Sequence, residues 1–257
     1  MTLGQEFHGW GFTINDEIEN LRAAQEHLKI VNLGATAIGT TVTAAPGYPE
    51  LAVKNLAELT GIDFKNSEDL IAATSDCGAY MTLSSAIKGL AVKMTKVCND
   101  IRLLASGPRC GLKEINLPQL QPGSSIMPGK VNPVAAEVAN QASFLAIGLD
   151  TTVMLAASAG QLELNVMEPV ITFALYTQMK VMTNACDTLR TKLVEGVTAN
   201  TERCKDYVMN SIGIVTLLKP HFGYQKCAAI AKEGYTTGKS LHLSLIHISE
   251  PTRLRRI

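Results

Sequence analysis

Apolar side chains recur at steps of three and four residues in one long stretch of the chain, from Asp76 to Ser106. This spacing places them on one face of a helix, as in helices that pack along their length in a bundle or coiled coil. Asp76 can cap the start, and Gly107 with Pro108 can end the helix. The face consists of Leu83, Ile87, Leu90, Met94, Val97, Ile101 and Leu104. The pattern therefore predicts a helix over 76–106.

A second face of the same kind predicts a helix through residues 171–193. Its members are Ile171, Leu175, Met179, Met182, Cys186, Leu189 and Leu193. Pro169 is expected to kink or interrupt the helical stretch that precedes it. Glu163, Asn165 and Glu168 also lie in that apolar stretch, where polar groups need partners. We expect them to form hydrogen bonds between helices in preference to contacting a substrate.

Two further helices are predicted. A weaker pattern covers Glu6–Lys29, with Phe12, Ile18, Leu21 and Leu28 on one face. Asn132 followed by Pro133 is a good helix start, a cap and then a first turn, and it leads into "VAAEVANQASFLAI". Strand signals are sparse. The fold class predicted is all-α, a long-helix bundle, and such faces often imply oligomerisation as well as packing within the chain. A monomeric bundle remains the alternative.

Composition narrows the classes of function. Lys+Arg and Asp+Glu number 23 each, so the formal net charge is +0, which argues against a nucleic-acid scaffold and leaves small-molecule substrates open. The six cysteines form no C-x-x-C pair, and no signal peptide opens the chain, so we expect reduced thiols in a cytoplasmic protein. No apolar run is long enough to cross a bilayer.

The end of the chain, "LSLIHISEPTRLRRI" at 243–257, differs from the rest. It lacks bundle periodicity, and its proline and three arginines continue no helix. The string resembles the translation of a transposase adapter used in sequencing libraries. We therefore hypothesise that the native chain stops near His242. A natural basic tail is the alternative, and the underlying codons decide between the two.

One loop, "GSSIMPGKVNPV" from Gly123 to Val134, cannot be helical itself. Gly123 and Gly129 permit backbone conformations closed to other residues, and the proline between them stiffens the loop. A loop of this composition, placed before a helix, is often a lid or a binding loop.

The same loop carries Ser124, Ser125, Lys130 and Asn132 within reach of one ligand. A cation, an amide and two hydroxyls together suit a substrate that bears a carboxylate or a phosphate. The alternative reading is purely structural: Asn132 as a cap, Lys130 as a solvated side chain and the serines as turn formers. Composition alone leaves both readings open.

The loop resembles the GSSxMPxKxNP signature of the fumarase/aspartase superfamily. Other stretches resemble the aspartase branch more than the fumarases, and the likeness extends over essentially 1–241. These are "VNLGATAIGT" (31–40), "EDLIAATSDCGAY" (68–80), "GQLELNVMEPV" (160–170), "TNAC" (183–186) and "NSIGIVT" (210–216).

The resemblance implies a chemistry and roles for the loop residues. Such lyases remove a proton beside a substrate carboxylate and expel the group on the neighbouring carbon, here ammonia from L-aspartate to give fumarate, through an aci-carboxylate. Ser124 corresponds to the general base. Lys130 and Asn132 hold the substrate carboxylate, and Ser125 donates to the carboxylate that gains charge. No cofactor and no metal site is assigned, and the expected assembly is a homotetramer with shared active sites. A fumarase-type hydratase and a non-catalytic structural homologue, as in lens crystallins, are the alternatives.

The resemblance also implies what the chain lacks. Aspartases carry, ahead of the residues that match Met1, segments that supply a Thr-His pair and a Ser/Thr-rich loop. Where the family has "GTGLN", this chain has "GTTVT" at 39–43, so a role for an asparagine there is in doubt. We expect a central bundle domain over 1–200, a partial C-terminal domain over 201–242 and a non-native tail over 243–257. The 257-residue chain alone is expected to be inactive.

Overall fold

The structure is a computed structural model that describes residues 1–123, 126–127 and 129–238. The helices are α1 (Leu3–His27), α2 (Tyr48–Thr60), α3 (Ala72–Ser75), α4 (Gly78–Leu104), α5 (Val134–Ala157), α6 (Glu168–Lys192), α7 (Thr201–Asn210) and α8 (Lys219–Thr237). Short 3-10 helices are η1 (Ala37–Gly39), η2 (Val194–Gly196) and η3 (Ile212–Leu218). The strands β1 (Ile30–Val31), β2 (Lys65–Asn66), β3 (Ile115–Asn116) and β4 (Thr198–Ala199) have two residues each. The predicted all-α class is confirmed.

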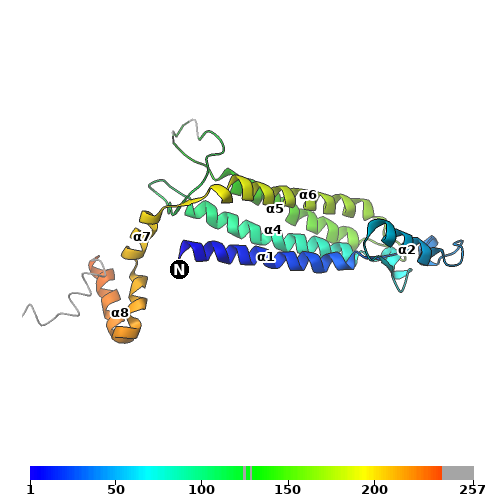
Figure 1. Cartoon of the computed structure of the whole chain (residues 1–257), viewed down its shortest axis with the longest axis horizontal. Coiled ribbons are helices and arrows are strands. Elements are labelled where there is room, and N and C mark those ends of the chain that lie inside the picture. Colours follow the sequence, from blue (N-terminus) through cyan, green and yellow to red (C-terminus); the bar gives the residue numbers. More distant parts are fainter. Residues whose placement is uncertain (124–125, 128, 239–257) are drawn as a thin grey trace, which may run out of the picture. The chain divides into compact units, whose positions relative to one another are not determined.

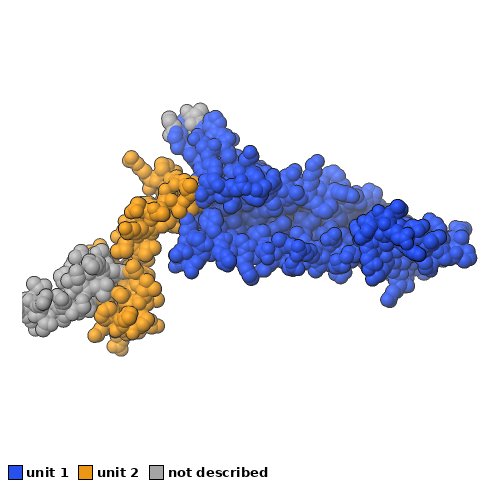
Figure 2. Space-filling view, in the orientation of Figure 1, with its two compact units in different colours: residues 1–106, 117–197 blue, residues 107–116, 198–257 orange. Residues whose placement is uncertain are grey.

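The chain divides into two compact units, coloured separately in Figure 2. Unit 1 comprises residues 1–106 and 117–197, and unit 2 comprises 107–116 and 198–257. The predicted domain boundaries stay predictions. The proposed adapter-derived tail lies outside the described residues.

Unit 1 contains a bundle in which α1, α4, α5 and α6 run side by side (Figure 1). Helix α5 packs against both α4 and α6, and α1 packs against α4. Alanines fill much of the contact surface and are at most 1% exposed; they are Ala91, Ala136, Ala139, Ala146 and Ala174. Small side chains let neighbouring helices approach closely, because the distance between helix axes depends on the side chains at the contact.

The predicted helix over 76–106 is observed as α4, close to the expected bounds. Asp76 does not occupy the cap position itself, which falls on Cys77, but its Oδ1 accepts a hydrogen bond from the Gly78 N–H at 3.1 Å. Five residues of the predicted face are buried, namely Ile87, Met94, Val97, Ile101 and Leu104. Leu90 is only partly covered.

The interruption expected at Pro169 is also observed. Helix α6 begins at Glu168, so Pro169 falls in its first turn, where the missing N–H leaves no helical hydrogen bond unmade. The preceding residues form a connection between α5 and α6, with an isolated bridge between Gln161 and Leu164. Glu163 lies in this connection, so its predicted place in a helix is wrong.

Asn165 lies in the same connection and is only 2% exposed. Its Nδ2 donates to the carbonyls of Ala156 and Ala157, both at 3.1 Å, and its Oδ1 accepts from the Met167 N–H at 2.8 Å. The polar partners that we expected exist, but they tie the end of α5 to the start of α6 instead of joining two helix faces.

The helix predicted over Glu6–Lys29 is observed as α1, but part of its predicted apolar face is not buried. Phe12 is 64% exposed and Ile18 is 42% exposed, while the buried residues are Trp10, Glu17 and Ala24. These three are seven residues apart and face α4. The charged Glu17 is tolerated in this contact because it forms an ion pair with Lys93 of α4.

Unit 2 is held by polar contacts around its strands and by a small apolar core. Strand β3 pairs antiparallel with β4. The Asn200 side chain donates to the Lys113 carbonyl at 2.8 Å, and the Tyr207 hydroxyl donates to the Leu112 carbonyl at 2.9 Å. Val215, Cys227 and Ile230 form the core between η3 and α8.

Two further observations concern the whole described chain. All six cysteines are unpaired. Over the residues that the structure describes, no helix combines the length and apolarity that crossing a membrane requires.

Candidate functional site

The loop that carries the predicted site lies in unit 1 and leads directly into α5. Lys130 is exposed and Asn132 is half-buried. The structure thus places two of the four predicted site residues in one short segment before α5. Ser124 and Ser125 lie outside the described residues, so their predicted place beside Lys130 and Asn132 stays a prediction.

A close backbone approach closes the base of this loop. A Cβ atom built on Gly123 would lie 2.2 Å from the carbonyl oxygen of Lys130, so only glycine fits at this position. Gly129 has φ +80°, a conformation that favours glycine. The Lys130 N–H then donates to the Met127 carbonyl at 3.3 Å. Both glycines of the motif therefore have a local steric or conformational reason.

The start of α5 differs from the prediction in one respect. The cap position is Pro133, not Asn132, and no side chain makes a cap hydrogen bond there. Pro133 still accepts the first helical bond, from the Glu137 N–H at 3.0 Å. Since Asn132 does not serve as the cap, capping does not occupy its amide.

Electrostatics at this end of α5 favour an anion. The N–H groups of the first helical turn carry a partial positive charge, and Lys130 adds a full one four residues before the helix starts. Glu137 in the first turn is half-buried and offsets part of this charge. Lys130, Asn132 and the first turn of α5 thus offer a cation, an amide and backbone N–H groups, which are the groups that suit a carboxylate.

A polar cavity that the sequence did not indicate lies near the start of α4. It has a volume of about 460 Å³ and is lined by His27, Asp76, Tyr80 and Glu168, among others. Burial, and then the negative charge of Glu168, raise the pKa of Tyr80. Helix α4 has 27 residues, so this cavity lies about 40 Å from the end of α4 that adjoins the start of α5. In the sequence, Asp76 indicated only a cap.

The comparisons with known proteins cover the loop and both helices around it. A family described as "Lyase" matches residues 1–148, more than half of the chain.

The chain belongs to this lyase family.

The resemblance to the fumarase/aspartase superfamily is confirmed with it. An aspartate ammonia-lyase of Escherichia coli K12 is 56% identical over 241 residues, which are 94% of this chain and 50% of the relative. An aspartate ammonia-lyase of Helicobacter pylori is 53% identical over 242 residues, 94% of this chain and 52% of the relative. The chain thus spans about half the length of the curated relatives that it matches.

Solved structures of this lyase family share the fold. A fumarate lyase:delta crystallin from Brucella melitensis, bound to cobalt, superposes with a TM-score of 0.92 at 43% identity, over 96% of this chain and 54% of that one. A recombinant class II fumarase from Schistosoma mansoni superposes with a TM-score of 0.90 at 31% identity, over 97% and 55% of the two chains. The long-helix bundle of this chain is therefore that of the lyases.

Proposed function

We propose that these residues serve an aspartate ammonia-lyase, which converts L-aspartate to fumarate and ammonia. The observation that carries this proposal is the 51–56% identity to several enzymes of that name, over nearly the whole chain. Identity to the class II fumarase is lower, at 31%. The comparison therefore favours ammonia elimination over the hydration of fumarate.

In the proposed mechanism, the loop stabilises the negative charge that develops on the substrate carboxylate. The ionised side chain of Ser124, favoured by nearby positive charge, takes a proton from the carbon beside one substrate carboxylate and becomes a neutral hydroxyl, and the electron pair moves onto that carboxylate to give the aci-carboxylate. Collapse of this intermediate forms the double bond and breaks the bond to nitrogen, which leaves as ammonia. Interactions that grow stronger as the negative charge develops lower the barrier most. Lys130, Asn132, Ser125 and the start of α5 are the groups we assign to that task.

We also propose that the enzyme is a cytoplasmic homotetramer with shared active sites. Large apolar side chains on α5 and α6 support assembly, because Phe144, Phe173 and Tyr176 are each more than half exposed in the single chain. Exposed apolar surface of this kind commonly marks contacts with other subunits. Six unpaired cysteines support a reducing compartment.

A chimeric enzyme tests the proposed activity. The 241 matched residues of the Escherichia coli relative are replaced by the corresponding residues of this chain, and fumarate and ammonia formation from L-aspartate are recorded. We expect turnover, and we expect Ser124→Ala to lower kcat by about 10²–10⁴-fold. Lys130→Met should lower kcat/KM by about 10²–10³-fold, whereas Lys180→Met, an exposed lysine of α6, should not.

The same chimera separates the alternatives. Malate formation from fumarate without ammonia release would identify a hydratase. A folded tetramer with no turnover of either substrate, and no change in ligand binding on Ser124→Ala, would favour a structural homologue.

A further inference from the structure

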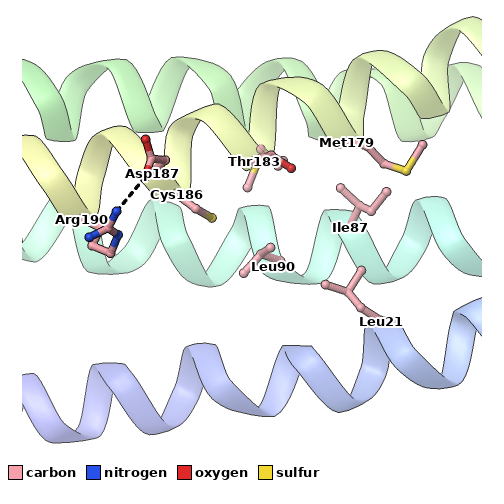
Figure 3. A pocket seen from close by; sticks show the side chains of 9 residues that line it. Leu21, Ile87, Leu90, Met179, Thr183, Cys186, Asp187 and Arg190 are labelled. Carbon is pink, nitrogen blue, oxygen red and sulfur yellow. Dashed lines mark hydrogen bonds and ion pairs between the residues drawn. The ribbon is translucent and has the colours of Figure 1, made fainter.

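Two cavities of unit 1 differ in the way their charged side chains are paired. One is an apolar groove of about 530 Å³ that is lined by residues of α1, α4 and α6 (Figure 3). Its charged residues bind each other, because Arg190 contacts Asp187 at 3.0 Å. The other is the polar cavity of about 460 Å³ near the start of α4, whose lining includes Asp76 and Glu168. Within the described part of the chain, these two carboxylates have no ion-pair partner.

The lining of the polar cavity carries negative charge. Asp76 and Glu168 are exposed, and no lysine or arginine is among the described residues that line the cavity. His27 is the one residue of this lining that can gain a positive charge. Each carboxylate lies at the start of a helix, Asp76 before α4 and Glu168 in the first turn of α6. Each helix start offsets about half a charge, so about one net negative charge remains.

The two carboxylates act on the same region at the start of α4. Burial raises the pKa of the Cys77 thiol, and the charges of Glu168 and Asp76 raise it further. Glu168 also raises the pKa of Tyr80, which lines the cavity. Both groups are therefore harder to ionise because negative charge is already nearby. A cation in the cavity would be attracted by both carboxylates together.

The lining excludes two classes of ligand and suits a third. Over the described chain, no group of three or more His, Cys, Asp or Glu side chains could hold a metal ion. A dicarboxylate would meet carboxylates without a lysine or arginine to bind it. The volume is in the range of pockets for small organic molecules, about 300–1,000 Å³. Further hydrogen-bonding side chains of the lining are Asn32, Ser67, Tyr80 and Thr82.

We propose that this cavity binds a small organic cation that carries a primary ammonium group. The ammonium group donates hydrogen bonds to Asp76 and Glu168, and such charge-assisted bonds are stronger than neutral ones. The hydroxyl and amide side chains of the lining bind the remainder of the ligand. The proposal concerns residues other than the loop at 123–134, so it goes beyond the proposed function and does not depend on it.

Three probes with four carbons each test the requirement for positive charge. Diaminobutane has an ammonium group at each end, butanediol has hydroxyl groups in their place, and succinate has carboxylates. Each is titrated calorimetrically into the 257-residue chain. We expect diaminobutane to bind at least tenfold more tightly than butanediol, and succinate not to compete with it. Added salt should weaken the binding of diaminobutane, because ions screen the attraction between exposed charges.

Matched variants test which carboxylates hold the probe. Glu168→Gln and Asp76→Asn each remove one charge at nearly constant size, and the latter keeps an oxygen that can accept from the Gly78 N–H. Glu163→Gln removes the same charge from an exposed residue that does not line the cavity. We expect each of the first two to weaken the binding of diaminobutane at least fivefold, and Glu163→Gln to leave it unchanged. Unchanged urea unfolding of each variant checks the fold.

Four outcomes would overturn the proposal. The first three are no binding of diaminobutane, equally tight binding of butanediol, and binding that neither Glu168→Gln nor Asp76→Asn weakens. The comparison of probes needs no variant, so it stands even if a variant unfolds. The fourth is binding to the 257-residue chain but not to the chimeric enzyme. A cationic side chain from the other half of the lyase would then be the occupant instead of a free ligand.

Discussion

Replacing Asp150 tests how the two helices in the middle of the bundle are joined. Its carboxylate, on α5, accepts a hydrogen bond from the Ser84 hydroxyl of α4 at 2.7 Å and an ion pair from Lys88 at 2.5 Å. Ser84 is fully buried, whereas the Lys88 side chain is 40% exposed. When the carboxylate is lost, Lys88 can therefore be solvated by water, whereas the Ser84 hydroxyl cannot.

The free energies of unfolding follow from that difference in burial. In Asp150→Ala the Ser84 hydroxyl is left buried without its acceptor, which costs about 1–3 kcal/mol. Lys88 can turn to water, so the lost ion pair costs about 0–1 kcal/mol. In Asp150→Asn the amide oxygen can still accept from Ser84, so only the smaller cost remains. We expect Asp150→Ala to be the more destabilising change by at least about 1 kcal/mol.

Urea unfolding followed by tryptophan fluorescence measures these changes in unit 1 alone. Trp10 is the single tryptophan of the chain and is buried in unit 1. In a Ser84→Ala background, Asp150→Ala should cost no more than the ion pair, because no hydroxyl is left unpaired. Equal destabilisation by Asp150→Asn and Asp150→Ala, or an unchanged cost in the Ser84→Ala background, would refute this reasoning.

Three more predictions concern the same unit and use the same unfolding measurement. Gly39→Ala should lower the free energy of unfolding by about 2–4 kcal/mol, because φ is +79° and a Cβ would lie 2.4 Å from backbone atoms just before α3. Gly148→Ala in α5 should raise it by about 0.5–1 kcal/mol, because a Cβ at Gly148 would meet no atom within 4 Å. Asn165→Asp should lower the free energy of unfolding by about 2–3 kcal/mol, because it replaces the amide N–H₂, which donates to two carbonyls, with an oxygen that cannot donate. An effect near zero would contradict the assigned hydrogen bonds. Burial raises the pKa of the Glu17 carboxyl. Hydrogen bonds with Lys93 and Asn20 and the charge of Lys93 outweigh burial and lower this pKa below its ordinary value of 4.5. The stabilisation from Glu17 is therefore present above about pH 4.5 and lost as the pH falls through its folded pKa, so the stability difference between the wild type and Glu17→Gln should narrow in acid; a constant difference would contradict it.

Much of the bundle could be predicted because its helices carry regular apolar faces and clear ends. The faces of α4 and α6 identified both helices, and Pro169 marked the start of the second. The connection between α5 and α6 could not be predicted, because apolar residues such as Leu162 and Leu164 continue through it up to Pro169. The hydrogen bonds of Asn165 and the bridge between Gln161 and Leu164 show that the chain turns there.

The candidate site was predictable as a segment but not as a geometry. The glycines and prolines of the loop excluded a helix, and the structure gives a steric reason for Gly123 that no composition can supply. The cap at Asn132 could not be decided from sequence, because Asn and Pro at adjacent positions each suit a helix start. Likewise, nothing in the spacing of His27 and Glu168 predicts that they line one cavity, since folding brings them together.

The apolar pattern of α1 and α6 and the contacts that these helices make differ for a physical reason. An apolar pattern records every contact for which a helix has been selected, whereas the fold of 257 residues shows only the contacts made among those residues. On α1, the residues that do pack on α4 include the charged Glu17, and Leu21 from the predicted face instead lines an apolar groove between α1 and α6. On α6, Met179 and Cys186 belong to the predicted face yet remain partly exposed beside Leu21. Leu21, Met179 and Cys186 therefore lie together on one surface, whereas the exposed Phe12 and Ile18 do not line it, so the apolar pattern alone does not tell which positions pack within the chain.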